Sequence, residues 1–358
     1  MLFSSKPQAL LLLPILASGL AGCATAGSTA GMSLPAVEVS ARGETAPVGT
    51  ANADAADDPA IWRNAADPSR SLVLGTDKKA GLYVYGLDGA VRDFAPAGAL
   101  NNVDVRELAD GRVIVAASDR ADEAVPKIAL FTLDTATGKL TSAGIADLAI
   151  DGVPASGEAY GFCMGAPLAP GELARGYVVL KQGRVLEASI REEGGAMRVE
   201  GLRAFGVGTQ SEGCVVDDEA HHFYLGEENV GIWRFDLTAT GPAAEPFAGI
   251  GVQDGLVADV EGLAIDRGDG RARLIASSQG DNAYAVFDLA TGDLVGRFRI
   301  AADKLGATSE TDGIELATGD FGPDFPGGLF VAQDGDNAPA AQNFKFVAWS
   351  DVIEALAR

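Results

Sequence analysis

The chain is poor in the residues that build common metal and nucleophile sites. Its 358 residues include three cysteines and two histidines, no Cys-x-x-Cys pair occurs, and His221 and His222 are adjacent. The sequence therefore lacks the ligand set of a zinc site. It also has no Gly-x-Ser-x-Gly elbow and no phosphate-binding P-loop. Hydrolysis through a serine nucleophile and nucleotide binding through a P-loop are accordingly not indicated.

Positive charge is also scarce. Lysine and arginine number 27 against 50 aspartates and glutamates, which gives a net charge of −23. This balance excludes an electrostatic footprint for nucleic acid or anionic lipid, and it suits a protein that recruits cations. Aromatic content is 7%, there are 46 glycines, and no long helical period is present. These features favour an all-β chain with tight turns.

The N-terminus has the pattern of a targeting segment. Lys6 precedes an apolar run over residues 9–20, and Leu20-Ala21-Gly22-Cys23 resembles a bacterial lipobox. We expect residues 1–22 to be a lipoprotein signal peptide and residues 23–35 a flexible tether, with a lipid on Cys23 as the outer-membrane anchor. The alternative is an ordinary secretory signal cut nearby. Either reading predicts an exported protein, as an outer-membrane lipoprotein or in the periplasmic or extracellular space.

A short motif recurs six times along residues 36–358. Each copy has a polar or acidic residue, usually then glycine, and then an apolar strand. Counted from Asp58 through Asn102, Gly161, Gly213, Gly262 and Gly313, the steps are 44, 59, 52, 49 and 51 residues. A strand repeat of about 40–50 residues is typical of a propeller. The sequence thus predicts one all-β domain, a six-bladed β-propeller.

The two ends of this domain have their own patterns. Residues 37–41 alternate as a strand, and we expect them to join the last sheet beside residues 344–349 and so close the ring. Residues 350–358 suit a short helix. Cys163 and Cys214 occupy matching positions at neighbouring strand starts, so either a disulfide or two buried thiols is consistent with the sequence.

Antiparallel pairing places the start of each first strand and the end of each second strand on one edge. In a ring, all twelve positions meet at one mouth. The second-strand ends are sorted by sign: Lys78, Arg120 and Lys181 come from the first three units, and Glu228 and Asp334 come from the fourth and sixth. Carboxylates from several strands suit Ca²⁺, and lysine and arginine suit phosphate oxygens. Bound cations could then activate water against a phosphoester without a protein nucleophile.

A set of ordered motifs spread over every unit carries a resemblance to a known family. The motifs are Ala55-Ala56-Asp57-Asp58-Pro59-Ala60-Ile61-Trp62, Lys78-Lys79, Leu100-Asn101-Asn102-Val103-Asp104, Tyr160-Gly161-Phe162, Glu212-Gly213, Asp259-Val260-Glu261-Gly262-Leu263, Ser277-Ser278-Gln279-Gly280, Thr311-Asp312-Gly313 and Phe330-Val331-Ala332-Gln333-Asp334-Gly335. From Val37 to Trp349 the chain resembles the β-propeller phytases. The resemblance implies a calcium-dependent 3-phytase that takes myo-inositol hexakisphosphate as its calcium complex and cleaves it with a calcium-activated water.

The resemblance also implies roles for individual residues. Those that match the calcium-lined pocket are Glu44, Asp57, Asp58, Tyr160, Glu212, Asp259, Glu261, Gln279 and Asp312. Those expected to contact phosphate are Lys78, Arg120, Lys181, Asn101 and Asn102. Those expected at the cleavage site are Tyr160, Lys181, Glu212 and Glu228. Gln182 stands where the family usually has glutamate. Lys79, Asp104 and Glu227 are interpreted as solvated charges.

Two other functions fit parts of the pattern. A non-catalytic lipoprotein propeller would bind partners on one face and would not need acids gathered at one mouth. Another calcium propeller hydrolase, such as a lactonase or organophosphate hydrolase, would use a compact calcium cage without a row of lysine and arginine. For the phytase we expect several Ca²⁺ ions, a small polyphosphate substrate, no nucleic acid partner and a monomer.

Overall fold

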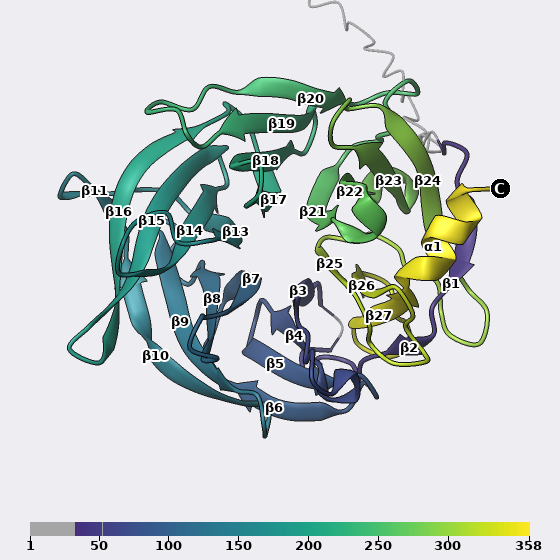
Figure 1. Ribbon diagram of the computed structural model, residues 1–358, viewed down its shortest axis with the longest axis horizontal. Helices are drawn as coiled ribbons and strands as arrows, with labels where there is room; N and C mark the ends of the chain where they lie inside the picture. Colours follow the sequence, from purple (N-terminus) through teal and green to yellow (C-terminus); the bar gives the residue numbers. More distant parts are fainter. Residues whose placement is uncertain (1–32, 52) are drawn as a thin grey trace, which may run out of the picture. The chain divides into compact units, whose positions relative to one another are not determined.

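The computed structural model describes residues 33–51 and 53–358, and these residues form a ring of six sheets (Figure 1). The first sheet contains β3 (Ala56–Trp62), β4 (Leu72–Asp77), β5 (Gly81–Gly86) and β6 (Val91–Ala95). The second contains β7 (Leu100–Glu107), β8 (Val113–Asp119), β9 (Lys127–Asp134) and β10 (Lys139–Asp147). The third contains β11 (Ala149–Ile150), β12 (Val153–Pro154), β13 (Ala159–Gly165), β14 (Glu172–Leu180), β15 (Arg184–Glu193) and β16 (Ala196–Gly206).

The remaining three sheets complete the ring. The fourth contains β17 (Ser211–Asp217), β18 (His222–Glu227), β19 (Gly231–Asp236) and β20 (Glu245–Gly249). The fifth contains β1 (Val37–Ser40), β21 (Val260–Asp266), β22 (Arg273–Ser278), β23 (Ala283–Asp288) and β24 (Leu294–Ala301). The sixth contains β2 (Gly43–Glu44), β25 (Ile314–Thr318), β26 (Gly328–Asp334) and β27 (Asn343–Ala348). The predicted six-bladed β-propeller is confirmed.

Five of the six innermost strands carry a bulge at the end that bears the polar motif, and β25 of the sixth sheet pairs without one. Pairing shifts register between Ala56 and Pro59 in β3, between Ser211 and Cys214 in β17, and at the matching point of β7, β13 and β21. A bulge bends the strand and re-aims its side chains, and such irregularities often lie next to active sites. The repeated polar residues therefore point toward the centre of the ring and do not follow the pleat.

The glycine in the repeated motif is required by close packing between neighbouring inner strands. A Cβ on Gly161 would lie 2.0 Å from the carbonyl oxygen of Glu212, and one on Gly213 would lie 2.2 Å from that of Glu261. Real side chains do not approach backbone this closely, so each glycine lets one sheet touch the acidic residue of the next. The acid–glycine pair is thus the joint between consecutive sheets.

Apolar side chains fill the gaps between sheets because each sheet buries both faces. Between the fifth and sixth sheets, Tyr284, Phe298, Phe330 and Trp349 pack with ring centroids 4.9–6.2 Å apart. Aromatic pairs at such distances contribute area burial and favourable edge contacts. This packing holds the polar strand starts rigidly at the centre.

The ring is closed by the N-terminal segment, with a different pairing from the one predicted. Residues Val37–Ser40 (β1) pair in parallel with Phe298–Ala301 of the fifth sheet, and Gly43–Glu44 (β2) pair with Lys345–Phe346 of the last sheet. The prediction placed the whole alternating strand on the last sheet. Arg42, between the two strands, binds Asp351 of the C-terminal helix, at 2.6 Å in the shorter contact. The predicted helix is present as α1 (Trp349–Leu356).

The two matching cysteines form a disulfide. Cys163 of β13 and Cys214 of β17 are bonded, with their Cα atoms 5.9 Å apart. This separation lies in the usual range for a disulfide. The bridge joins the strand that carries Tyr160 to the strand that carries Glu212.

The predicted signal peptide and Cys23 lie outside the described residues. Leu34, at the end of the predicted tether, is buried, and its N–H donates to Asp281 at 2.9 Å. In the described part of the chain, no helix has the length and apolar character needed to cross a membrane.

Candidate functional site

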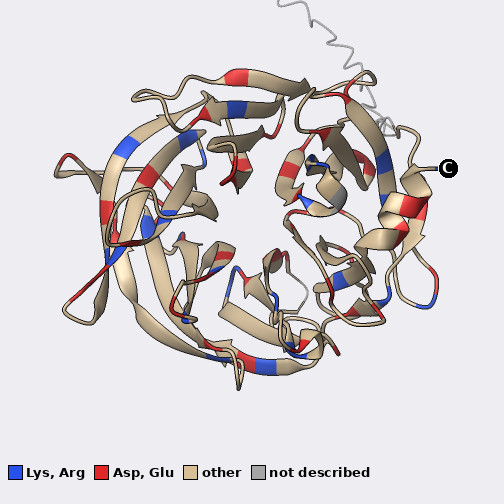
Figure 2. Cartoon of the chain, viewed as in Figure 1, with Lys and Arg blue, Asp and Glu red and all other residues tan. Residues whose placement is uncertain are grey.

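A cavity of about 1070 Å³ opens at the polar ends of the inner strands. Its lining comes from the first, third, fourth, fifth and sixth sheets and the loops between them. Figure 2 shows acidic residues around the centre of the ring. The predicted site residues that line it are Lys78, Tyr160, Glu212, Glu228, Asp259, Glu261, Gln279 and Asp312. The structure thus brings together eight of the residues that the sequence assigned to the mouth.

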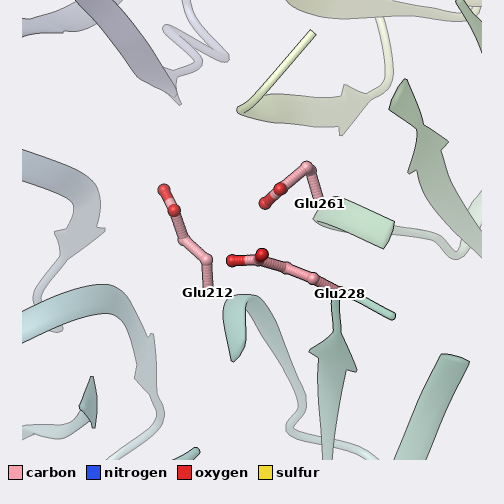
Figure 3. Close-up of side chains that lie close together, drawn as sticks. All are labelled: Glu212, Glu228 and Glu261. Carbon is pink, nitrogen blue, oxygen red and sulfur yellow. The ribbon is translucent and has the colours of Figure 1, made fainter. Parts of the chain in front are cut away.

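Three buried glutamates converge on one point of this cavity. Glu212 comes from β17, Glu228 follows β18 and Glu261 comes from β21, and each supplies a carboxylate oxygen within 4.8 Å of the others (Figure 3). Burial raises the pKa of all three carboxyls, and repulsion from neighbouring acids adds to it. Glu228 Oε1 and Glu261 Oε2 are buried and have no hydrogen-bond partner among the described residues. Unpaired oxygens in this arrangement fit a hard divalent cation such as Ca²⁺.

Lys78 lies among the acids of the cavity. Its ammonium forms ion pairs with Asp57 at 2.8 Å, Asp54 at 2.9 Å and Asp312 at 3.2 Å. Burial would lower the pKa of Lys78, but Asp57 and Asp312 raise it well above its usual value. A permanently charged Lys78 therefore holds the carboxylates of the first and sixth sheets together.

Asp312 and Gln279 form the adjoining wall. The amide Nε2 of Gln279 donates to Asp312 Oδ1 at 2.7 Å. Burial, with repulsion from Asp57, raises the pKa of Asp312 to about 7. Asp259 lines the same wall at the start of β21. Together these residues add oxygen donors beside the three glutamates.

Asn101 connects two sides of the mouth: an acidic side with Asp57 and Glu212, and a cationic side with Arg120. Its Nδ2 donates to Glu212 Oε1 at 2.8 Å and to Asp57 Oδ1 at 3.3 Å, while its Oδ1 accepts from Arg120 at 2.6 Å. With its amide nitrogen turned toward them, Asn102 donates to the Tyr160 carbonyl at 2.9 Å and to Glu212 at 3.1 Å. Both asparagines are buried. Each amide dipole is thereby oriented by the charges on either side.

The cationic side is built around Tyr160. The Arg120 guanidinium lies 5.0 Å and the Lys181 ammonium 4.8 Å from the centre of the Tyr160 ring. Neither cation lines the main cavity, whereas Tyr160 does. Burial, with repulsion from Glu212 and Glu261, raises the pKa of the Tyr160 hydroxyl, which stays protonated. Tyr160 thus separates the acids from the two cations. Gln182, next to Lys181, is exposed and contributes an amide in place of a carboxylate.

Asp58 is directed to a different place from Asp57. It lines a narrow channel of about 50 Å³ along the axis, with Asp104 and Glu315. Its Oδ2 accepts from the Val103 N–H at 2.9 Å. Burial raises the pKa of Glu315 to about 8 and that of Asp104 to about 6, with repulsion between the two adding to the rise for Glu315. The structure therefore separates Asp58 from the main cavity.

Two residues interpreted as solvated charges have buried partners instead. Asp104 accepts from the Met164 N–H at 2.7 Å in the channel. Glu227 is buried and accepts from Trp233 Nε1 at 2.7 Å, which anchors the turn after β18. Lys79 is exposed, in agreement with its interpretation. Both acids carry hydrogen-bonding roles that a single sequence does not reveal.

Glu44 also lies elsewhere. Its Oε2 pairs with the ammonium of Lys345, which is fully buried and also contacts Asp334 at 3.3 Å and Asn337 at 3.2 Å. Glu44 is not part of the lining of the main cavity. Both carboxylates share the Lys345 ammonium, so this group is an internal ion-pair cluster.

Sequence reasoning missed several residues of the cavity wall. Asp54 pairs with Lys78, and Gln210, Asn282, Glu310 and the loop from Gly335 to Gln342 complete the lining. Asp54 and Gln210 each lie a few residues before a repeat motif, so closeness to the motif was an available signal. Glu310 directly precedes the motif Thr311-Asp312-Gly313 and offered the same signal, whereas the loop from Gly335 to Gln342 has no periodic pattern that indicates the cavity.

The fold and the site define a six-bladed β-propeller whose central mouth joins buried carboxylates to lysine and arginine. A profile of the phytase family matches residues 6–358. The 3-phytase of Bacillus subtilis (strain 168) is 36% identical over 330 residues, which cover 89% of this chain and 85% of that protein. The chain belongs to the phytase family.

One similar solved structure is that of a functionally unknown protein from Desulfotomaculum acetoxidans DSM 771. It is 14% identical, with a TM-score of 0.47, over 71% of this chain and 73% of that chain. This similarity is too low to bear on the function.

Proposed function

We propose that this protein is a calcium-dependent 3-phytase that removes phosphate from myo-inositol hexakisphosphate by attack of a calcium-activated water. The observation that carries the proposal is the convergence of Glu212, Glu228 and Glu261, with unpaired buried oxygens, in a propeller of the phytase family. The 36% identical 3-phytase supports the substrate class. We propose the substrate's calcium complex as the form taken, because it reduces repulsion between a polyanion and this acidic mouth.

The residues that would hold calcium ions are those whose oxygens face the cavity. They are Glu212, Glu228, Asp259, Glu261, Gln279 and Asp312, with Asp57 beside them on the Lys78 ammonium. When bound, the ions would neutralise phosphate oxygens, polarise the phosphorus and lower the pKa of water. Among the described residues, no serine, cysteine or histidine lines the cavity, so a nucleophile of these three types is not part of the proposal.

The protein's own groups have three tasks in this proposal. Arg120 and Lys181 bind phosphate oxygens by charge-assisted hydrogen bonds from the cationic side. Tyr160, which keeps its proton, offers a neutral O–H donor between that side and the glutamates. Asn101 holds Glu212 and Arg120 in fixed relation across the mouth. Rigid orientation of this kind is a large part of catalytic rate enhancement.

The test is phosphate release from myo-inositol hexakisphosphate with and without a calcium chelator. We expect release with Ca²⁺, loss of release with excess chelator, and recovery when Ca²⁺ is restored. Lactones and phosphotriesters in parallel serve as substrates for other propeller hydrolases. Absence of phosphate release with every divalent cation tried would reject the proposal, and turnover of a lactone in its place would assign a different hydrolase.

We also propose that the protein is an exported, monomeric lipoprotein held in the outer membrane by a lipid on Cys23. The lipobox-like Leu20-Ala21-Gly22-Cys23 and the Cys163–Cys214 disulfide support export, because disulfides persist in oxidising compartments. The test is fractionation of a Cys23→Ser variant. Its release from the membrane is expected, and retention equal to that of the parent would contradict the anchor.

A further inference from the structure

Glu158 lies between the two cations of the mouth. It precedes β13 (Ala159–Gly165), and its side chain is 9% exposed. One carboxylate oxygen forms an ion pair with Arg120 from the end of the second sheet's β8. The other lies 3.8 Å from the ammonium of Lys181, which follows β14 of the third sheet. One buried acid thus connects cations from two neighbouring sheets.

The two cations have few other restraints on their positions. Arg120 donates through Nη1 to Asn101 at 2.6 Å, and the main-chain N–H of Lys181 donates to the Glu158 carbonyl at 3.1 Å. Glu158 is the single acid that pairs with the Lys181 ammonium among the described residues. Both cations lie within 5.0 Å of the centre of the same Tyr160 ring and pair with the same carboxylate, so their like charges repel each other. A shared anion offsets that repulsion.

The net charge around these residues favours an anionic ligand. Lys78 has three carboxylate partners, whereas Arg120 and Lys181 share one. Counted by formal charge, Lys78 and its three carboxylates carry a net −2. Arg120, Lys181 and Glu158 together carry a net +1. An incoming phosphate therefore meets unbalanced positive charge at Arg120 and Lys181, with Glu158 behind them.

We propose that Glu158 is the positioning residue for phosphate binding: it holds Arg120 and Lys181 at one spacing so that both present donors to the same phosphate group. The inference rests on the proposed function and extends it to a residue to which the motifs assigned no role. Glu158 does not itself contact phosphate, because its carboxylate is occupied by the two cations. Gln182, an exposed amide beside Lys181, carries no charge that could take over this task.

The kinetic test is the variant Glu158→Gln. The amide keeps the shape of the side chain and a hydrogen-bond acceptor for Arg120, but it loses the charge that attracts Lys181. Because positive charge at the mouth is retained, we expect KM to stay within about twofold. Because Lys181 is misplaced, we expect kcat to fall by about tenfold to a hundredfold. Glu158→Asp restores the charge and is expected to recover part of kcat.

The matched control is Glu172→Gln. Glu172 is an acid of the same sheet whose side chain is 1% exposed and is also shared by two cations, Arg175 at 2.8 Å and Arg191 at 3.3 Å. It does not line the main cavity, so both kinetic constants should stay unchanged. An equal fall of kcat in Glu172→Gln would assign the effect to general weakening of the sheet and would overturn the proposal. An unchanged kcat in Glu158→Gln would overturn it as well.

A measurement independent of catalysis separates this inference from the proposed function. The protein is treated with a small excess of an acetylating reagent, and mass spectrometry measures the extent of acetylation at each lysine. In Glu158→Gln the Lys181 amine loses its ion pair, so we expect it to react several-fold faster, while Lys78 keeps its three partners and serves as the internal reference. Unchanged Lys181 reactivity would reject the positioning role even in an active enzyme. If Lys181 is acetylated faster in Glu158→Gln but the parent releases no phosphate, the proposed function is rejected and the positioning of Lys181 by Glu158 stands.

Discussion

Lys78 and the Arg120–Lys181 pair occupy equivalent places in the repeat yet have opposite surroundings. Each follows the second strand of its sheet. The Lys78 ammonium is enclosed by Asp54, Asp57 and Asp312, whereas the other two cations share Glu158 and lie over Tyr160. Lys78 therefore acts as a counter-ion within the acidic side, and Arg120 and Lys181 form a separate cationic side. Position in the repeat decides that a residue reaches the mouth, and its neighbours from other sheets decide what it can do there.

The comparison is tested most strongly by Lys78→Met. Removing the ammonium leaves buried carboxylates without compensation, and breaking a buried ion pair costs about 3–5 kcal/mol. We expect a loss of this size in the free energy of unfolding, measured by denaturant titration in chelator, and a smaller loss with Ca²⁺ present. Lys181→Met, at a more exposed ion pair, should change stability by less than about 1 kcal/mol. Equal losses for the two variants would contradict the distinction.

The second prediction concerns the covalent link between the two sides. Cys163 and Cys214 are 51 residues apart, so chain-entropy arguments give the disulfide about 4 kcal/mol of stability. The double variant Cys163→Ser/Cys214→Ser should unfold at correspondingly lower denaturant concentration, with kcat little changed. The measurement is made in a Cys23→Ser background. Thiol titration of that unfolded, unreduced parent should find no free thiol, and two free thiols would refute the bridge.

The third prediction concerns Glu261 on the acidic side. Glu261→Gln removes one converging carboxylate, so we expect weaker Ca²⁺ binding by calorimetry and a fall in kcat/KM of about a hundredfold, in the range seen when groups supporting a metal site are lost. The same change removes repulsion with Asp312 and Glu228, so the melting temperature in chelator should rise. A variant with lower activity but no change in Ca²⁺ affinity would show that Glu261 acts in another way.

The smallest effect is expected in the axial channel. Burial and Asp104 raise the pKa of Glu315 to about 8, above its ordinary value of 4.5. The folded state therefore holds this proton more tightly than the unfolded chain, and its contribution to stability falls as pH rises from about 5 to 8. In chelator at pH 8, the melting temperature of Glu315→Gln should be a few degrees above that of the parent. At pH 5 the two melting temperatures should be nearly equal. The exposed Glu200→Gln serves as control, and a difference independent of pH would contradict the assignment.

Much of the site could be predicted because the repeat is local. The bulged strand starts and the acid–glycine pairs are encoded within a few residues, and each positions a side chain at the centre in the same way. Glu212, Glu261 and Asp312 were found for that reason. Asp58 lies in the axial channel, apart from the main cavity, and the sequence did not indicate this separation from its neighbour Asp57. Glu44 lies outside the main cavity beside Lys345, a partner 301 residues away that spacing along the chain does not indicate.

The sequence by itself determined the all-β class, the number of sheets and many of the strand ends that meet at the mouth. All of these depend on periodic spacing and on turn chemistry that acts over a few residues. Tertiary structure decided which charges meet: the three acids around Lys78, the sharing of Glu158 by two cations, the bonding of Cys163 to Cys214 and the sheet that β1 joins. These depend on contacts between sheets, and electrostatic and packing energies at such contacts follow from distance in space, not from distance along the chain.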